Sequence, residues 1–308
     1  MLETRNPSAT DTADPSAASP SEPSTRRPTP RPASSQWARV FRNPRVVVPG
    51  LVLFVIVGMA VTAPWILPHD PYLMDSPVSL QGPSLEHPFG TDEYGRDLLS
   101  RVILGGRSSL LIAVGSVTLA TMLGVGFGIV GGYFGGIWEF LTMRSVDVLL
   151  TIPPILLAIA VVAFLGPGRG NLIAVIGILY MTRFARITFS SVLQVKVREY
   201  VEASRTIGAG PFRILRTAIL PNILAPIFVQ ISLSLGFAIL LESGLSFLGL
   251  GTPPPEPSWG NMIGIGRGYM QQSAWYVLWP ALAISITILC CNSLGDGLRD
   301  SLDPRLKR

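Results

Sequence analysis

The chain alternates between long apolar stretches and short segments that hold most of its charges. A helix of about 20 apolar residues crosses the hydrocarbon core of a bilayer, and six stretches match or exceed that length. They cover residues 46–67, 109–131, 141–165, 171–190, 222–249 and 274–294. Arg183 and Arg186 interrupt the end of the fourth stretch, which is the weakest of the six. The pattern predicts an all-α, polytopic membrane protein with six transmembrane helices.

The composition of the 308 residues agrees with lipid as the solvent for most of the chain. Only 14% of residues are charged, against about 25% in soluble proteins. The hydrophobic share is 48% and the mean hydropathy is +0.46. A net charge of +5 is accounted for by an anionic membrane surface, so no nucleic-acid partner is expected. Cys290 and Cys291 are adjacent in an apolar stretch, which indicates packing residues rather than a disulfide framework.

The distribution of basic residues predicts the orientation. Residues 1–36 are rich in Ser, Thr, Pro and Ala, which is typical of a disordered tail. We interpret the first apolar stretch, which follows this tail, as an uncleaved signal anchor. Of the 24 Arg and Lys residues, 19 fall on the side that holds both termini and the connection between the fourth and fifth spans. The positive-inside rule places that side in the cytoplasm and the segment 68–108 outside.

Small residues recur every four positions along the second span. They are Ser116, Ala120, Gly124, Gly128 and Gly132. Such a stripe lets a neighbouring helix approach closely, so we expect a helix-packing face here. A sliding or hinge contact is the alternative interpretation.

The cytoplasmic connection at about 193–221 is amphipathic. Apolar and charged residues take separate faces of a short helix that begins near Arg198, and Gly208 and Gly210 then interrupt it. Pro211 begins a second short amphipathic helix. The element should lie at the membrane surface. It either rests among the headgroups or docks into a groove of a partner protein.

Several motifs resemble one protein family, in the same order along the chain. Glu202-Ala203-Ser204, Gly208 and Ile219-Leu220-Pro221 resemble the E-A-A loop of ABC importer permeases, with Ser204 in place of the second Ala. Further stretches resemble the dipeptide/oligopeptide branch: His87–Asp92, Tyr94–Asp97, Leu245–Gly251, Pro257–Gly260, Gly295–Asp300 and Asp303–Arg305. Residues 37–308 therefore resemble the C-type membrane subunit of a dipeptide, oligopeptide or nickel importer, as one permease domain.

The resemblance implies a pore-forming subunit of an ATP-driven, binding-protein-dependent importer of peptides in a bacterial or archaeal plasma membrane. A homologous second permease would complete the pore, two ATPase subunits would hold ATP and Mg, and an extracellular solute-binding protein would deliver the cargo. We expect no cofactor and no catalysis in this chain, because a P-loop needs Gly-Lys-Ser/Thr and the only lysines are Lys196 and Lys307. Nickel or a glutathione-like solute is the alternative cargo.

In this family the E-A-A loop is a coupling helix that sits in a cleft of the ATPase. By resemblance, Glu202 contacts the ATPase with Ala203 and Ser204 beside it, and Gly208 permits the chain reversal that presents the helix. The motif ends with Ile219, Leu220 and Pro221. Closure of the ATPases would pull on this element and shift the spans from inward-open to outward-open.

Three residues inside the spans are candidates for the translocation path. Pro153 and Pro154 remove two backbone donors from the third span and predict a kink. Glu242 lies in the fifth span, where a carboxylate is costly and often functional. Each feature also has a structural interpretation: the prolines as a bend in a lipid-buried helix, and Glu242 as a partner of another polar group.

The other charged and metal-ligating residues favour structural roles. Asp147 is expected to pair with Arg144 or Arg186. The two histidines, His69 and His87, both fall in the external segment without cysteines or carboxylates in metal-ligand spacing, so no metal site is predicted. That segment also holds six acidic residues, which suit either a landing surface for the binding protein or an ordinary solvated loop.

Two other functional classes are less consistent with the sequence. A membrane-embedded hydrolase needs a Ser–His pair, a zinc-binding pair of histidines or an aspartyl pair inside the spans, and both histidines lie outside them. A stand-alone secondary transporter usually has more spans and an internal inverted repeat. Whether the chain moves substrate alone or only with ATPase partners separates these classes from the importer.

Overall fold

The computed structural model describes residues 43–302, so the predicted tail at 1–36 lies outside the described residues. Within that range the regular elements are helical. The long ones are α2 (Pro44–Ile66), α3 (Leu98–Phe134), α6 (Arg169–Lys196), α9 (Leu220–Phe247) and α11 (Trp275–Leu302). The shorter ones are η1 (Ser76–Val78), α4 (Gly136–Leu150), α5 (Pro154–Leu165), α7 (Glu199–Thr206), α8 (Pro211–Ile214), η2 (Leu215–Ile219), α10 (Trp259–Gly266) and η3 (Arg267–Tyr269).

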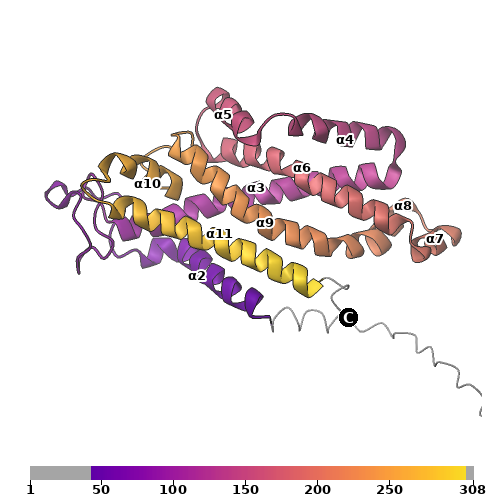
Figure 1. Cartoon of the computed structure of the whole chain (residues 1–308), viewed down its shortest axis with the longest axis horizontal. Helices are drawn as coiled ribbons and strands as arrows, with labels where there is room; N and C mark the ends of the chain where they lie inside the picture. The colour runs from indigo at the N-terminus through magenta and orange to yellow at the C-terminus, as the bar shows by residue number, and fades with distance from the viewer. Residues whose placement is uncertain (1–42, 303–308) are drawn as a thin grey trace, which may run out of the picture.

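The long helices run side by side along the longest axis of the molecule (Figure 1). The loop after α2 and the short helix α10 gather at one end of this bundle, and α7 and α8 gather at the other (Figure 1). Five helices are long and apolar enough to cross a membrane, and the bent pair α4–α5 is a sixth candidate. The predicted all-α, polytopic architecture is confirmed. The separation of the two loop regions agrees with the predicted opposite sides.

The closest helix contact joins α3 to α6 and uses the predicted small-residue stripe. A Cβ atom built on Gly124 would lie 2.5 Å from Phe184 Cβ, and one on Gly128 would lie 2.5 Å from Thr188 Cβ. One on Gly132 would lie 2.9 Å from the Cβ of Val192. These distances are too short for any side chain. The stripe therefore brings the two helix backbones together, as the sequence predicts.

The predicted third span is broken rather than gently kinked. The chain leaves α4 at Leu150 and starts α5 at Pro154, and the axes of the two helices differ by 89°. Two consecutive prolines cannot donate to the carbonyls of the preceding turn, and Pro153 takes an extended ψ of 127°. The two halves form either one broken span or a re-entrant loop. Arg186 on α6 secures α4 through an ion pair of 2.8 Å with Asp147, which confirms one of the two predicted pairings.

The second span begins earlier than the hydropathy pattern predicts. Asp97 caps α3 by accepting a hydrogen bond from the backbone N–H of Ser100 at 2.8 Å, so the helix begins at Leu98, ahead of the apolar stretch at 109–131. Arg101 follows on the first turns of α3 and lies 3.2 Å from Asp92. Arg96 pairs with the same carboxylate at 2.6 Å. A hydropathy window scores the first turns of α3 as polar because it counts each charged residue separately. In the structure Arg96 and Arg101 are buried in ion pairs with Asp92.

This ion-pair cluster changes the interpretation of the acidic external loop. The side chains of Asp92 and Asp97 are almost completely buried, and that of Glu93 is only 8% exposed, where it pairs with Arg96. Three of the six acidic residues therefore hold the loop together. They belong neither to a landing surface nor to a solvated face.

Candidate functional site

The helix–glycine–helix element predicted at 193–221 is present as α7, α8 and η2. It extends past the ends of α6 and α9 at one end of the bundle (Figure 1). Val201 is its internal anchor: it is fully buried in an apolar cluster with Val192 of α6, Ile214 of α8 and Ile223 of α9. The opposite face of α7 is exposed. Helix α7 is therefore attached to the bundle through the buried Val201, and its exposed face carries Glu202 and Arg205.

The predicted coupling residues divide into two groups. Glu202 and Ala203 are exposed on α7, and Ser204 beside them is partly exposed and donates its hydroxyl to the carbonyl of Tyr200 at 2.8 Å. Ile219, in contrast, is fully buried in the cluster around Val201. The first half of the motif can contact a partner. In the second half, Ile219 supports the element from within the cluster.

Gly208 has the backbone conformation that the resemblance requires. Its φ is +80°, in the left-handed region that disfavours other residues, and open space surrounds it. The amide of Gly208 closes the end of α7 by donating to the carbonyl of Arg205 at 2.9 Å. Gly210, two residues later, has an ordinary φ of −68°. Only the first of these glycines is required by the reversal.

The second predicted short helix is continuous with the fifth span. After α8 the backbone forms one π-helical turn, η2, and then continues into α9. Pro221 supplies no amide donor at the start of α9, and the π-turn lies directly before it. Such single π-turns inside α-helices are rare. Pro221 is exposed and Leu220 partly buried. A force on α8 is therefore transmitted directly to α9, whereas α7 is connected to it through the turn at Gly208.

Polar contacts also join α7 and its approach to the end of α3. A pocket of about 350 Å³ lies between Tyr133, Lys196, Val197, Glu202 and Arg205. The Lys196 ammonium donates to the carbonyl of Gly132 at 2.7 Å, and the Arg205 guanidinium lies 5.8 Å from the centre of the Tyr133 ring. The small element thus contacts α3, α6 and α9.

Sequence reasoning missed two side chains of this surface. Ile207 is 84% exposed at the end of α7, and Phe212 is 77% exposed on α8. The sequence left open whether the apolar side chains of this element face the headgroups or a partner protein. Exposed apolar side chains beside charged ones are typical of protein contact surfaces. The sequence signal for these two residues was their position on either side of Gly208.

The candidate path residue Glu242 is fully buried in α9. Its carboxylate accepts hydrogen bonds from Ser246 at 2.7 Å and from Ser243 at 3.3 Å. The hydroxyls of Ser109 on α3 and of Ser258, which caps α10, lie near the same carboxylate. Within this chain Glu242 therefore lies where three helices meet. Its role in a path remains a prediction.

Pro153 and Pro154 are exposed at the break between α4 and α5. The neighbouring helices carry large apolar side chains toward the outside, including Trp138, which is 53% exposed, and Phe164, which is 89% exposed. The break therefore belongs to a surface that lipid or another apolar helix can cover. Its place in a translocation path also remains a prediction.

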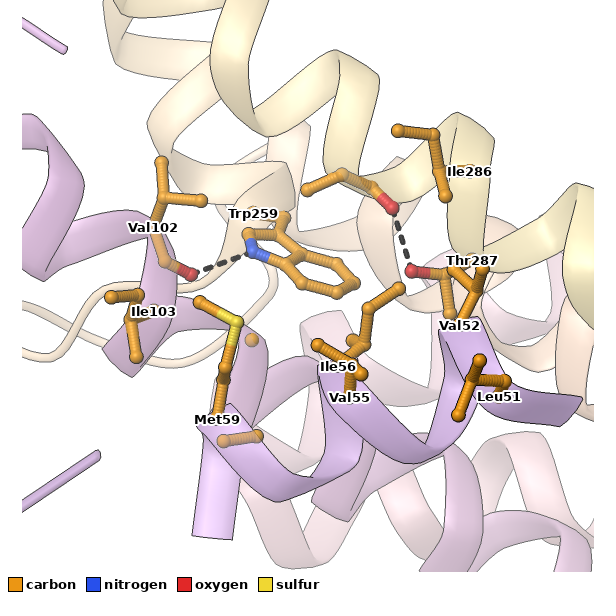
Figure 2. Close-up of a pocket in the computed structure, with 13 residues that line it drawn as sticks. Leu51, Val52, Val55, Ile56, Met59, Val102, Ile103, Trp259, Ile286 and Thr287 are labelled. Atoms are coloured by element: carbon orange, nitrogen blue, oxygen red, sulfur yellow. Dashed lines mark hydrogen bonds between the residues drawn. The ribbon is translucent and has the colours of Figure 1, made fainter. Parts of the chain in front are cut away.

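An apolar pocket lies beside α2 and does not suit a polar cargo. A cavity of about 420 Å³ is lined by α2, α3, α11 and Trp259 (Figure 2). The Trp259 indole donates to the carbonyl of Val102 at 2.9 Å, and the Thr287 hydroxyl donates to that of Ala283 (Figure 2). The other lining side chains are apolar. A charged solute would find no free polar side chain there.

Comparison with known proteins identifies the family. Residues 124–308 match the model for "binding-protein-dependent transport system inner membrane component", and residues 32–83 match that for the "N-terminal TM domain of oligopeptide transport permease C". The di/tripeptide transport system permease protein DppC of Pseudomonas aeruginosa is 41% identical over 90% of this chain and 94% of its own length. The glutathione transport system permease protein GsiD of Escherichia coli is 41% identical over 88% and 90%.

A solved structure shows the same fold. An inward-facing form of the MetNI methionine ABC transporter superposes with a TM-score of 0.54 at 20% identity, over 67% of this chain and 97% of the other. At that identity the match supports the helical arrangement alone. The family models and the full-length relatives carry the assignment: the chain belongs to the inner-membrane permeases of binding-protein-dependent ABC transporters, as a C-type subunit.

Proposed function

We propose that this chain forms half of the transmembrane pore of a peptide importer and that α7 couples it to ATP hydrolysis in partner subunits. The observation that carries the coupling role is the placement of α7. A short helix with an exposed Glu202 stands at one end of the bundle, is held by one buried side chain and is terminated by a left-handed Gly208. This is a suitable shape for docking into a cleft.

The contacts of α7 explain how docking would move the spans. Val201 packs against α6 and α9, and Arg205 lies near Tyr133 of α3. A partner that binds the exposed face differently in two nucleotide states would shift the balance between two packings of these helices. The ATP and Mg would be bound by the two ATPase subunits, and α7 of this chain would transmit their movement to the spans.

The remaining partners follow from the family. A homologous second permease would cover the exposed apolar side chains around the α4–α5 break, including Trp138 and Phe164. An extracellular binding protein would meet the end of the bundle that carries the loop after α2 and α10. Both termini and α7 would then lie in the cytoplasm, as the basic residues predict.

The cargo is proposed to be a dipeptide or short oligopeptide. The relative from Pseudomonas aeruginosa is named for di- and tripeptides, and that from Escherichia coli for glutathione, which is itself a modified tripeptide. Glutathione is therefore the second candidate. Nickel, the other alternative for this branch, has no support among these two relatives.

Uptake of a labelled dipeptide by cells that express the whole transporter tests the coupling role. Glu202→Lys and Gly208→Asp should abolish uptake while the chain remains in the membrane with its partner permease. Gly210→Asp is the matched control, because its backbone is unstrained and equally open. Normal uptake by the Glu202→Lys and Gly208→Asp variants would refute the role of α7.

The cargo is tested separately by recovery of the associated binding protein and identification of its bound ligand. A peptide supports the first candidate and glutathione the second. A chain that purifies without ATPase subunits and transports alone would overturn the importer proposal and favour a secondary transporter.

A further inference from the structure

The two histidines of the chain, separated by 18 positions in sequence, meet in the structure. His69 follows the end of α2, and His87 lies in the loop before α3. Their ring centres are 4.8 Å apart. Both rings point to Asp97, the residue that caps α3: the Nδ1 atom of His87 lies 3.0 Å from Asp97 Oδ1, and that of His69 lies 3.9 Å from the same oxygen.

The three ligand atoms have nearly the spacing of a metal site. One ligand atom from each residue lies within 4.8 Å of the other two. In a tetrahedral zinc site, bonds of about 2.0–2.1 Å place neighbouring ligand atoms about 3.3 Å apart. The pair formed by His87 and Asp97 already has that spacing. The ring of His69, which is 36% exposed, needs to move inward by about 1 Å to complete the set.

A free ligand atom gives independent support. Nδ1 of His69 is buried and has no hydrogen-bond partner among the described residues. A buried polar atom without a partner is costly, and a missing ligand or ion is one explanation. A metal ion between the two rings and the carboxylate would use this lone pair.

The surroundings fix the ligands as they do in known metal sites. Oδ2 of Asp97 accepts the Ser100 amide at 2.8 Å, which leaves Oδ1 facing the histidines. The hydroxyl of Ser100 accepts the backbone amide of His69 at 3.2 Å. The backbone of His87 is held by Ser84, whose hydroxyl accepts its amide at 2.9 Å. The contact to Asp97 orients a ligand carboxylate, as in known metal sites, and the two amide contacts hold the backbones of the histidines in place.

We propose that His69, His87 and Asp97 form a binding site for a divalent transition-metal ion, with zinc as the natural test ion, at the end of the bundle opposite α7. Two imidazoles and one carboxylate are a donor set that zinc accepts, with a fourth position left for water. The ion would tie the end of α2 to the start of α3 across the intervening loop. This proposal rests on the geometry of the loop and is independent of the transported solute.

The test is a zinc titration of the full chain, purified with its partner subunits in detergent through a tag that contains no histidine. Competition with a chromophoric chelator gives stoichiometry and affinity. The wild type should bind one zinc ion more per transporter than the His69→Ala/His87→Ala variant. Each single variant should bind that ion at least about 100-fold more weakly. Removal of a contact that only supports a ligand costs about 10–100-fold, and removal of a ligand itself should cost no less.

Further variants separate a ligand role from a folding role. Asp97→Asn keeps a side-chain oxygen for the Ser100 amide, so α3 stays capped while the charged ligand is lost and zinc affinity falls. Glu86→Gln is the matched control, because Glu86 is an exposed carboxylate beside His87 but outside the set. Zinc should also slow proteolysis within the loop 67–97 of the wild type alone. Equal zinc binding by the wild type and the double variant, or none by the folded wild type, would overturn the proposal.

Discussion

The contact between α3 and α6 offers a matched pair of substitutions on one helix. Gly128 faces α6, and a Cβ atom there would lie 2.5 Å from Thr188 Cβ and 2.7 Å from the carbonyl oxygen of Ala185. Gly126, half a turn away, is exposed and has no atom within 4 Å of the same built position. Gly128→Ala therefore forces the helices apart, whereas Gly126→Ala adds a methyl group to open space.

The expected magnitude follows from the difference between the two variants. Alanine in place of a helical glycine stabilises a helix by about 0.5–1 kcal/mol, and this gain is common to both positions. Overpacking of a close contact costs about 1–3 kcal/mol. Because the clash at Gly128 involves a backbone carbonyl, which no rotamer change relieves, the cost should fall in the upper half of that range. The difference in the free energy of unfolding should therefore be about 2–3 kcal/mol.

Equilibrium unfolding in mixed micelles, with the denaturing detergent as the variable, measures this difference. Gly126→Ala should unfold at the same or a higher fraction of denaturing detergent than the wild type, and Gly128→Ala at a clearly lower one. Peptide uptake should follow the same order. Equal unfolding of the two variants would refute the close approach of α3 and α6 and the stripe that explains it.

Three further predictions concern other parts of the molecule. Gly208→Ala should weaken the coupling element by about 1–2 kcal/mol because of its positive φ, while Gly210→Ala is neutral; proteolysis of the loop compares them. Glu242→Ala should lower stability by about 1–3 kcal/mol because the hydroxyls of Ser243 and Ser246 lose their acceptor, whereas Glu242→Gln keeps one oxygen and most of the stability; thermal unfolding in detergent that ranks the two variants equally would contradict these hydrogen bonds. Asp147→Ala should cost at most about 1 kcal/mol, since its ion pair with Arg186 is half exposed, and a double-mutant cycle measures that coupling.

Hydropathy and small-residue spacing predicted most of the helical architecture. The stripe ending at Gly132 correctly identified the face of α3 that packs on α6. Two features of the helices were not predicted, for physical reasons. The start of α3 was missed because Arg101 and Asp92 neutralise each other, and a sequence window counts such a pair as two charges. The third span was predicted as one kinked helix, yet two consecutive prolines separate α4 from α5 by 89°.

The coupling element was located from sequence, but the orientation of its residues was not. Gly208 and Gly210 indicated the end of a short helix, and the structure has Glu202 exposed on α7 and Gly208 exposed just after its end. Which side chains of the motif turn inward depends on contacts with α6 and α9, and the burial of Ile219 follows only from those contacts.

The histidines show the limit of spacing arguments most clearly. His69 and His87 have no metal-ligand spacing along the chain, so no metal site was predicted. They meet because the loop folds back onto the start of α3, where the amide of Leu98 donates to the carbonyl of Gly90 at 3.0 Å. Gly90 has a φ of +84° at that reversal. Such a long-range meeting of side chains cannot be read from a local pattern.

Site-specific photo-crosslinking tests the central claim, that α7 docks on an ATPase, most directly. A benzophenone amino acid in place of Ala203, which is exposed on α7, should crosslink to an ATPase subunit in intact membranes, and the yield should change with ATP. The same label in place of the fully exposed Leu85, in the loop at the opposite end of the bundle, should give no ATPase crosslink. Absence of an ATPase product from position 203, or equal products from both positions, would contradict the account.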